Sequence, residues 1–261
     1  MKTMLVTGAN DGIGLETARQ LLKLGHRMVV HARSEATATA AVQKLGGGEA
    51  VWGDLAEMAQ VVALAGQVAN LAPSIDVLVN NAGVYQVRRE LTPDGFESTM
   101  AINHFSHMLL TLKLLPQLKA AKAPRVVTVA SGVHQGAALD LDDLQISKNW
   151  SPYGSYATSK LANVLFAAEL AAREGDWLLS FSLHPGVIST KLLHKGFGAG
   201  GASLESGALT SVYCATRPGL EKFNGGYFSN SAPAGANKKA DDPQFRKALW
   251  DRSSALLKNW L

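Results

Sequence analysis

Short apolar, β-branched runs alternate with longer segments of helical periodicity along most of this chain. The expected strands are Met4–Val6, Met28–His31, Val51–Trp52, Val77–Asn80, Val126–Val129 and Leu179–Leu183. The expected helices are Ile13–Leu24, Glu35–Lys44, Met58–Leu71, Pro93–Leu118 and Tyr156–Arg173. Continuous apolar runs are typical of strands buried on both faces, and their alternation with helices implies right-handed crossovers between parallel strands. The sequence therefore predicts an α/β fold, a doubly wound, Rossmann-type domain with a central parallel sheet.

Long connections interrupt this alternation in its second half. Ala137–Ser155 follows the fifth expected strand, and the glycine-rich Lys191–Leu204 follows the sixth. Ligands of open α/β sheets bind beyond the carboxyl ends of the strands, so both segments are expected to border the ligand site. Gly225–Ser229 is expected to be a last strand and Asp242–Leu257 a final helix. We expect one domain over residues 1–261, with a substrate loop at 191–204.

Composition excludes several classes of protein. No apolar run approaches the roughly 18 residues of a membrane-spanning helix, and no secretory signal precedes the first expected strand. The 25 basic and 21 acidic residues are scattered rather than gathered into a patch typical of nucleic-acid binding. Cys214 is the only cysteine, which excludes an intrachain disulfide and fits a reducing compartment. We therefore expect a cytoplasmic protein with no membrane span and no nucleic-acid partner.

A glycine-rich turn, Thr7–Gly14, lies between the first expected strand and the first expected helix. Its glycines, Gly8, Gly12 and Gly14, have the spacing G-x-x-x-G-x-G. Glycines let the backbone turn tightly and approach a pyrophosphate, whose charge then faces free N–H groups at a helix start. A glycine cluster alone often marks only a turn, but its place between a strand and a helix favours dinucleotide binding.

The end of the second expected strand bears on the choice of cofactor. An acidic residue there would bind the ribose 2′-hydroxyl of NAD, whereas an arginine accommodates the 2′-phosphate of NADP. Ala32 and Arg33 offer no carboxylate and one guanidinium able to grip a phosphate. The alternative is an ordinary surface arginine. We predict NADP(H) as the preferred cofactor, with NAD(H) as the alternative.

Tyr156 and Lys160 open an expected helix with a spacing that places them on one face. The phenol and the ammonium can therefore point into one site. A free phenol with a pKa of ~10 is a poor proton acceptor at neutral pH, and a nearby cation lowers that pKa. We predict that Tyr156 acts as a general acid and base. The spacing alone is common, and its alternative is a half-buried tyrosine beside a solvated lysine.

Several stretches together resemble the short-chain dehydrogenase/reductase family. They are Thr7–Gly14, Asn80–Gly83, Ser131, Tyr156–Lys160 and Pro185–Gly186, in the order typical of the family. Longer phrases that look most like its retinol-dehydrogenase-like branch are Ser159–Phe166, His184–Val187, Asp143–Gln145 and Leu249–Asp251. The resemblance implies an oxidoreductase that moves hydride between NADP(H) and a lipophilic carbonyl or alcohol, working as a homodimer or homotetramer. Members of this branch often carry a membrane anchor, which we do not expect here because the chain begins directly with its first strand.

The resemblance also implies roles for individual residues. Ser131 would hydrogen-bond the substrate oxygen, and Tyr156 would transfer the proton. Lys160 would hold the nicotinamide ribose and lower the pKa of Tyr156, and Asn103 would hold a water in the proton relay. The implied cofactor-binding residues are Gly8, Asn10, Asp11, Gly12, Ile13, Gly14, Arg33, Asp54, Leu55, Asn81, Ala82, Gly83, Tyr156, Lys160, Pro185, Gly186, Ile188 and Thr190. Asp11 departs from the family pattern, because many members that prefer NADP carry a basic residue there.

Other interpretations stay open. Asn103 could be a buried amide bonded to backbone, and Ser131 could be a turn residue. His134 close to Ser131 suggests hydrolase chemistry, but the surrounding residues do not form a G-x-S-x-G elbow. The chain could also be a non-catalytic NADP(H)-sensing or scaffold protein, or an epimerase or dehydratase of the same superfamily, for whose longer substrate domain 261 residues leave little room. The seven histidines form no metal-binding pattern, so no metal is expected.

The expected lining of a substrate pocket is apolar and aromatic. Its segments are Val84–Val87, Val133–Leu139, Trp150–Tyr153 and Leu192–Phe197. Such a lining suits a lipophilic carbonyl or alcohol, although the same loops could serve only to shield the nicotinamide.

Overall fold

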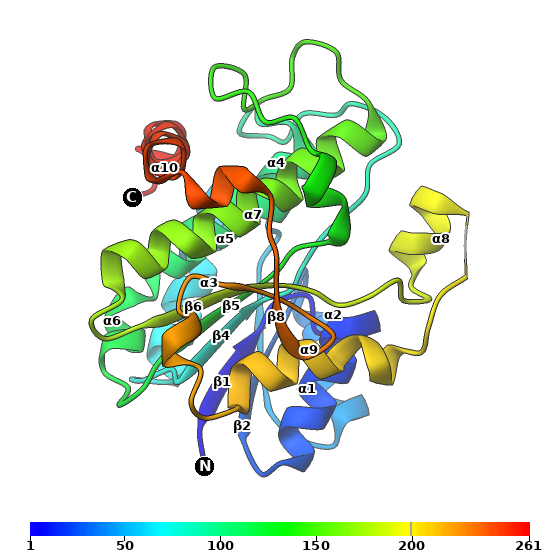
Figure 1. Cartoon of the computed structure of the whole chain (residues 1–261). Helices are drawn as coiled ribbons and strands as arrows, with labels where there is room; N and C mark the ends of the chain where they lie inside the picture. Colours follow the sequence, from blue (N-terminus) through cyan, green and yellow to red (C-terminus); the bar gives the residue numbers. More distant parts are fainter. Residues whose placement is uncertain (199) are drawn as a thin grey trace.

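In a computed structural model, which describes residues 1–198 and 200–261, one sheet runs through the centre of the molecule (Figure 1). Its strands are β1 (Thr3–Val6), β2 (Arg27–Ala32), β3 (Glu49–Trp52), β4 (Val77–Asn80), β5 (Arg125–Val129), β6 (Leu179–His184), β7 (Tyr227–Ser229) and β8 (Ala232–Ala234). They lie in the order β3-β2-β1-β4-β5-β6-β7-β8, and every neighbouring pair is parallel except β7 and β8. The direction of winding reverses between β1 and β4, at the switch point where such sheets bind ligands. The predicted α/β fold with a central parallel sheet is confirmed.

Helices cover both faces of this sheet. They are α1 (Gly12–Lys23), α2 (Glu35–Leu45), α3 (Met58–Leu71), α4 (Ser98–Met100), α5 (Ser106–Lys113), α6 (Leu115–Lys119), α7 (Pro152–Glu174), α8 (Lys191–Phe197), α9 (Leu204–Thr216) and α10 (Pro243–Leu257). Short turns of other helix types are η1 (Ala101–Phe105), η2 (Gly132–Gly136), η3 (Glu221–Phe223) and η4 (Lys238–Asp241).

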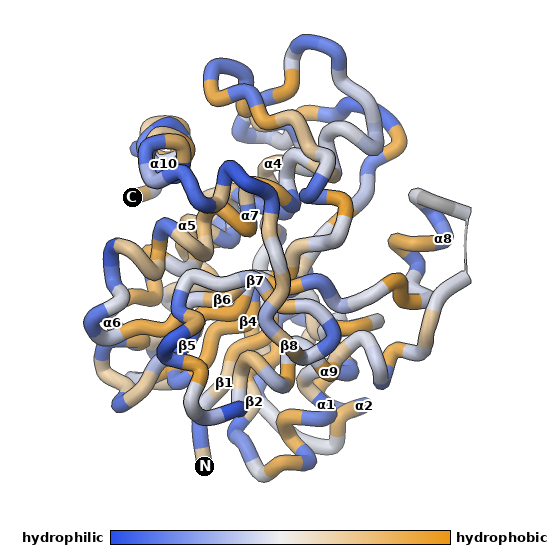
Figure 2. The backbone as a smooth tube through the Cα atoms, in the orientation of Figure 1, coloured by the Kyte–Doolittle hydropathy of each residue, from blue (hydrophilic) through white to orange (hydrophobic). Residues whose placement is uncertain are grey.

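Strand side chains alternate between the two faces, and each face is buried under its own helices. Leu5 belongs to the core formed with α3, α5, α7 and α10, whereas Met4 and Val6 belong to the core formed with α1 and α9. Figure 2 shows the resulting hydrophobic colouring along the central strands. The carboxyl ends of the strands are thereby held at one edge of a two-sided core.

The segment Pro93–Leu118, predicted to be one helix, is broken in the structure. Its start is a turn in which Gly95 N donates to Thr92 O and Thr92 N donates to Phe96 O. The helical part begins only with α4, passes through the π-helical turn η1 into α5, and is interrupted at Leu114 before α6. The prediction of an unbroken helix from Pro93 is wrong because Gly95, with a φ of 80°, closes that turn.

Other boundaries shift by a few residues. α7 begins at Pro152 rather than at Tyr156, because Ser151 Oγ accepts from Gly154 N at 3.0 Å and caps the helix. β7 is shorter than the predicted Gly225–Ser229, and the antiparallel strand β8 was not predicted. In the described parts of the chain, no helix combines the length and apolar character that crossing a membrane requires.

Candidate active site

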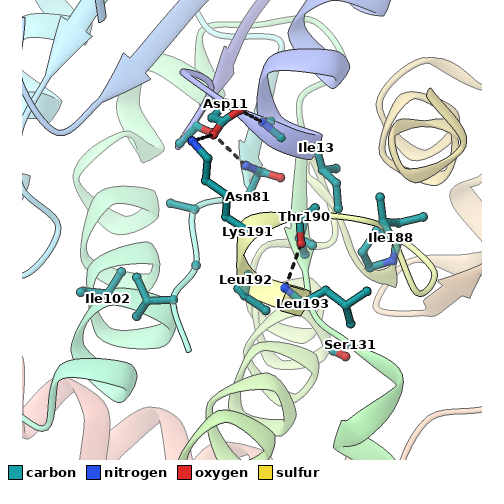
Figure 3. A pocket seen from close by; sticks show the side chains of 18 of the residues that line it. Asp11, Ile13, Asn81, Ile102, Ser131, Ile188, Thr190, Lys191, Leu192 and Leu193 are labelled. Atoms are coloured by element: carbon teal, nitrogen blue, oxygen red, sulfur yellow. Dashed lines mark hydrogen bonds and ion pairs between the residues drawn. The ribbon is translucent and has the colours of Figure 1, made fainter. Parts of the chain in front are cut away.

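A cavity of about 790 Å³ opens beyond the carboxyl ends of the central strands (Figure 3). Its wall is built from the segments that follow β1 to β6, and its volume falls in the range typical of small-molecule and cofactor sites. Every residue predicted to bind the cofactor lines this wall, as does Ser131. The structure therefore brings together residues that are scattered over most of the sequence.

The glycine turn packs tightly against the loop after β4. Gly8 has a φ of 62°, and a Cβ on it would lie 2.9 Å from Ala82 Cα. A Cβ on Gly14 would collide with the Gly8 carbonyl oxygen and the Asn81 side-chain amide. Side chains at Gly8 and Gly14 are thus excluded, which lets the glycine turn and the start of α1 pack closely against the loop after β4. The start of α1 lines the cavity, and backbone N–H groups at a helix start suit the pyrophosphate of a dinucleotide.

His31, near the end of β2, holds this turn in place. Gly8 N donates to His31 Nδ1 at 3.1 Å, so Nε2 carries the proton and donates to Gly53 O at 2.9 Å. Burial lowers the pKa of His31 to about 4, which keeps the ring neutral. His31 is not among the residues predicted for the site. The signal available in the sequence was a polar side chain in an otherwise apolar strand.

The end of the cavity near β2 carries groups suited to a phosphate. Arg33 is exposed there, and Ser34 and Thr37 line the same wall. Ser34 caps α2 by accepting a hydrogen bond from Thr37 N, so a second helix start faces this end. A guanidinium, hydroxyl groups and a helix start together could hold the 2′-phosphate of NADP.

Asp11 and Lys191 meet at the cavity wall, as Figure 3 shows. Asp11 Oδ1 accepts from Gly12 N at 2.8 Å, and its Oδ2 lies 2.6 Å from Lys191 Nζ. The hydrogen bond from Lys191 lowers the pKa of Asp11. Lys191, the first residue of α8, is not among the predicted site residues, because no local pattern reveals a partner so distant in the sequence.

Tyr156, Lys160 and Ser131 converge on the opposite side of the cavity. Lys160 Nζ lies 5.5 Å from the ring centroid of Tyr156 on the same face of α7. Ser131, which directly precedes η2, lines the same cavity. Lys160 Nζ also donates to Val129 O at 3.1 Å, at the end of β5. A phenol, a hydroxyl and an amine are thus arranged for proton transfer.

Burial sets the acidity of these groups. It raises the pKa of Tyr156 to about 12, and the neighbouring Ser131 side chain acts in the opposite direction. It lowers the pKa of Lys160 to about 8, because a charged amine loses its contacts with water. The raised pKa of Tyr156 reflects the loss of hydration around the phenol, which is the largest effect on it. That Lys160 lowers the pKa of Tyr156 stays a prediction.

Asn103, in η1, lies behind the cavity wall rather than on it. Its Nδ2 donates to Val84 O at 3.0 Å and to Ser159 Oγ at 2.9 Å, and its Oδ1 accepts from Val84 N at 2.8 Å. The alternative interpretation of Asn103, a buried amide held by hydrogen bonds to its neighbours, accounts for these three bonds. A Cβ on Gly83 would lie 3.3 Å from Lys160 Nζ and 3.5 Å from Asn103 Oδ1, so both side chains adjoin the same small space. The water-holding role of Asn103 stays a prediction.

His134 fixes the backbone of Ser131. Its Nδ1 donates to Ser131 O at 2.7 Å, and Asn237 N donates to its Nε2 at 3.3 Å. Burial lowers the pKa of His134, which favours the neutral ring that this pair of bonds requires. Both ring nitrogens are engaged with backbone groups, so the ring is not aimed at Ser131 Oγ. His134 therefore positions the backbone of Ser131 and does not form the histidine–serine pair of a hydrolase.

Comparison with known proteins identifies the family. Residues 2–197 match the profile of the short chain dehydrogenases. This chain belongs to the short-chain dehydrogenase family. It is 35% identical to retinol dehydrogenase 14 of Homo sapiens, over 98% of this chain and 86% of that protein. It is 38% identical to polyprenol dehydrogenase of Mus musculus, over 95% of this chain and 82% of that protein.

A solved structure from Mycobacterium paratuberculosis is similar in fold and in sequence. It is 34% identical, with a TM-score of 0.83 over 99% of this chain and 94% of that one. The resemblance to the short-chain dehydrogenases and to their retinol-dehydrogenase-like branch is therefore confirmed.

In this short-chain dehydrogenase, α8 lies beside the candidate catalytic tyrosine. A Cβ on Gly196 would lie 2.9 Å from Tyr85 Cγ, so α8 packs directly on the Tyr85 ring. That ring in turn lies 5.4 Å from the ring of Tyr156, centroid to centroid. The apolar residues that line the cavity include Val84, Val133, Leu192 and Leu193.

Parts of the predicted substrate lining lie elsewhere. Trp150 does not line the cavity, because its indole N–H donates to Glu97 Oε1 at 3.1 Å. Ala199 of the predicted loop and the side chain of Phe197 lie outside the described residues. Among the residues that the structure does describe, no group of three or more His, Cys, Asp or Glu side chains is placed to hold a metal ion.

Proposed function

We propose that this short-chain dehydrogenase is an NADP(H)-dependent oxidoreductase acting on lipophilic alcohols and carbonyls, with Tyr156 as its general acid and base. The observation that carries the proposal is that Tyr156, Ser131 and Lys160 line the same cavity as the glycine turn, with Lys160 Nζ 5.5 Å from the Tyr156 ring centroid. One cavity thus holds a proton-transferring pair and a dinucleotide cradle, which is the combination that hydride transfer to or from an oxygen-bearing carbon needs.

Each residue of the candidate site has its own role in the proposed reaction. When bound, the nicotinamide cofactor supplies or accepts the hydride. Ser131 holds the substrate oxygen, and the Tyr156 hydroxyl gives that oxygen a proton in reduction and takes one from it in oxidation. Lys160, whose pKa is lowered to about 8, supplies positive charge beside the phenol while it is protonated.

Cofactor preference is supported by the groups near β2. Arg33, Ser34 and Thr37 offer a phosphate a charge and hydroxyl groups. A lipophilic substrate is supported by the apolar side chains that line the cavity beside α8. The relatives named for retinol and polyprenol, both long apolar alcohols, support the same substrate class.

A turnover screen with NADP(H) and NAD(H) over lipophilic aldehydes, ketones and secondary alcohols tests the proposal. Tyr156→Phe should lower kcat/KM by about a hundredfold or more, because general acid–base catalysis contributes that much. NADPH binding should persist, since only a hydroxyl is removed. Tyr153→Phe is the matched control: Tyr153 lies on the same helix, is 50% exposed and does not line the cavity, so activity should be kept.

Unchanged turnover in Tyr156→Phe would overturn the proposal. NADPH binding by the unaltered chain without turnover of any panel compound would favour the non-catalytic sensor instead.

A further inference from the structure

The carboxylate of Asp11 lies where an anionic cofactor would need positive potential. Asp11 is the N-cap of α1, and its side chain is 47% exposed on the cavity wall. A helix start attracts phosphates through its N–H groups and its dipole, whereas a fixed negative charge there repels them. The negative charge of Asp11 therefore opposes phosphate binding by the glycine turn, although the backbone of the turn is suited to it.

Lys191 is placed to cancel that charge. Its Nζ lies 2.6 Å from Asp11 Oδ2, and both side chains line the cavity. The geometry is set by the start of α8, where Thr190 Oγ1 accepts from Leu193 N at 3.1 Å. A Cβ on Gly12 would lie 3.9 Å from Thr190 Cγ2, so the start of α8 adjoins the glycine turn. Figure 3 shows the lysine reaching from α8 to the turn.

Stability does not account for this pair. The Lys191 side chain is 92% exposed, and ion pairs between exposed groups contribute little to folding because water and salt screen them. Its effect falls instead on the potential of the cavity, which is lined by low-dielectric protein and is sensitive to single charges. Arg33 lines the same cavity and would act in the same direction.

We infer that Lys191 is a specificity-determining residue for the cofactor: by neutralising Asp11 it allows the glycine turn to accept the phosphates of NADP(H). The inference rests on the proposed function, because it assumes that this cavity binds the dinucleotide. NADPH should depend on Lys191 more strongly than NADH does, because its 2′-phosphate adds a charge of about −1.5 to −2.

The test is a set of dissociation constants for NADPH and NADH, measured by calorimetry without substrate. Lys191→Met should weaken NADPH binding by roughly threefold to tenfold at low salt, and by less at high salt, where charges are screened. Asp11→Ser should bind NADPH as tightly as the unaltered chain or more tightly. The double variant should return to within about twofold of the unaltered chain, because the local charge is again balanced.

Lys195→Met is the matched control, since Lys195 is an exposed lysine of the same helix that does not line the cavity. It should leave both dissociation constants unchanged, and Lys191→Arg should retain NADPH binding. Equal NADPH affinity in Lys191→Met and the unaltered chain would overturn the inference. A double variant that binds NADPH as weakly as Lys191→Met would also overturn the inference, because the lysine would then not act through Asp11. If the unaltered chain binds neither NADPH nor NADH, the proposed function is overturned as well. If it binds NADPH with an affinity that does not depend on Lys191, only the inference is overturned.

Discussion

At the scale of the residue, the burial that places Lys160 in the candidate active site also lowers the stability of the folded chain. Its side chain is 3% exposed, its Nζ donates to Val129 O, and burial lowers its pKa to about 8. A base whose pKa falls on folding is protonated more readily in the unfolded chain. The resulting penalty is complete below about pH 8 and disappears above the unfolded value of 10.5.

Lys160→Met should therefore stabilise the fold at pH 7 while removing turnover. The change in pKa from 10.5 to about 8 corresponds to ~3 kcal/mol, from which the lost hydrogen bond to Val129 O subtracts ~1 kcal/mol. Urea unfolding should show a gain of about 2 kcal/mol at pH 7 that shrinks towards zero near pH 10. Lys258→Met, at an exposed position, should change neither stability nor turnover. A clear loss of stability in Lys160→Met at pH 7 would contradict the argument.

At the scale of the element, local patterns could be predicted from the sequence and tertiary effects could not. The strands β1, β2 and β4 were predictable because burial on both faces makes most of each strand an apolar run. β8 was not, because Ala232–Ala234 is exposed and only its pairing with β7 makes it a strand. The helix start at Pro93 was misplaced because apolar periodicity continues through a turn that Gly95 closes.

The candidate site divides in the same way. The glycine turn and the spacing of Tyr156 and Lys160 are readable from a few adjacent residues. His31 and Lys191 could not be assigned, because each acts through a partner brought close only by the fold. The raised pKa of Tyr156 depends on burial by several elements, which no local pattern reports.

The packing of α8 on Tyr85 leads to a prediction about substrate binding. Alanine favours a helix over glycine by about 1 kcal/mol, yet a Cβ on Gly196 would lie 2.9 Å from Tyr85 Cγ. Gly196→Ala should therefore displace the C-terminal turn of α8 and raise KM for the lipophilic substrate several-fold, while the Kd for NADPH changes less than KM because Lys191 lies at the other end of the helix. Gly200→Ala, in the same segment with open space around it, is the control and should behave like the unaltered chain. An unchanged KM in Gly196→Ala would mean that α8 does not shape the substrate side of the cavity.

At the scale of the whole molecule, buried histidines make the stability of the fold depend on pH. His31, His104 and His107 are at most 2% exposed and lie on β2, η1 and α5. Burial lowers the pKa of His31 and of His104 to about 4, and that of His107 well below its usual value. His104 also links η1 to the C-terminal helix α10, because its Nε2 lies 3.1 Å from Ser253 Oγ. All these rings are therefore neutral at pH 7, and folding resists their protonation.

Acid should accordingly unfold this protein well above the pH at which its carboxylates titrate. For a base whose pKa falls from 6.5 to about 4 on folding, stability is complete above pH 6.5 and falls by ~1.4 kcal/mol per pH unit down to about pH 4. Between pH 7.5 and pH 5 each such histidine should remove about 2 kcal/mol from the free energy of unfolding measured in urea. His104→Gln should make this drop about 2 kcal/mol smaller, whatever its effect at pH 7.5, because one titrating ring is gone from the core. His194→Gln, at an exposed position on α8, should leave the drop unchanged. If both variants lose the same free energy between these pH values, proton uptake by the core histidines does not govern the acid sensitivity of the fold.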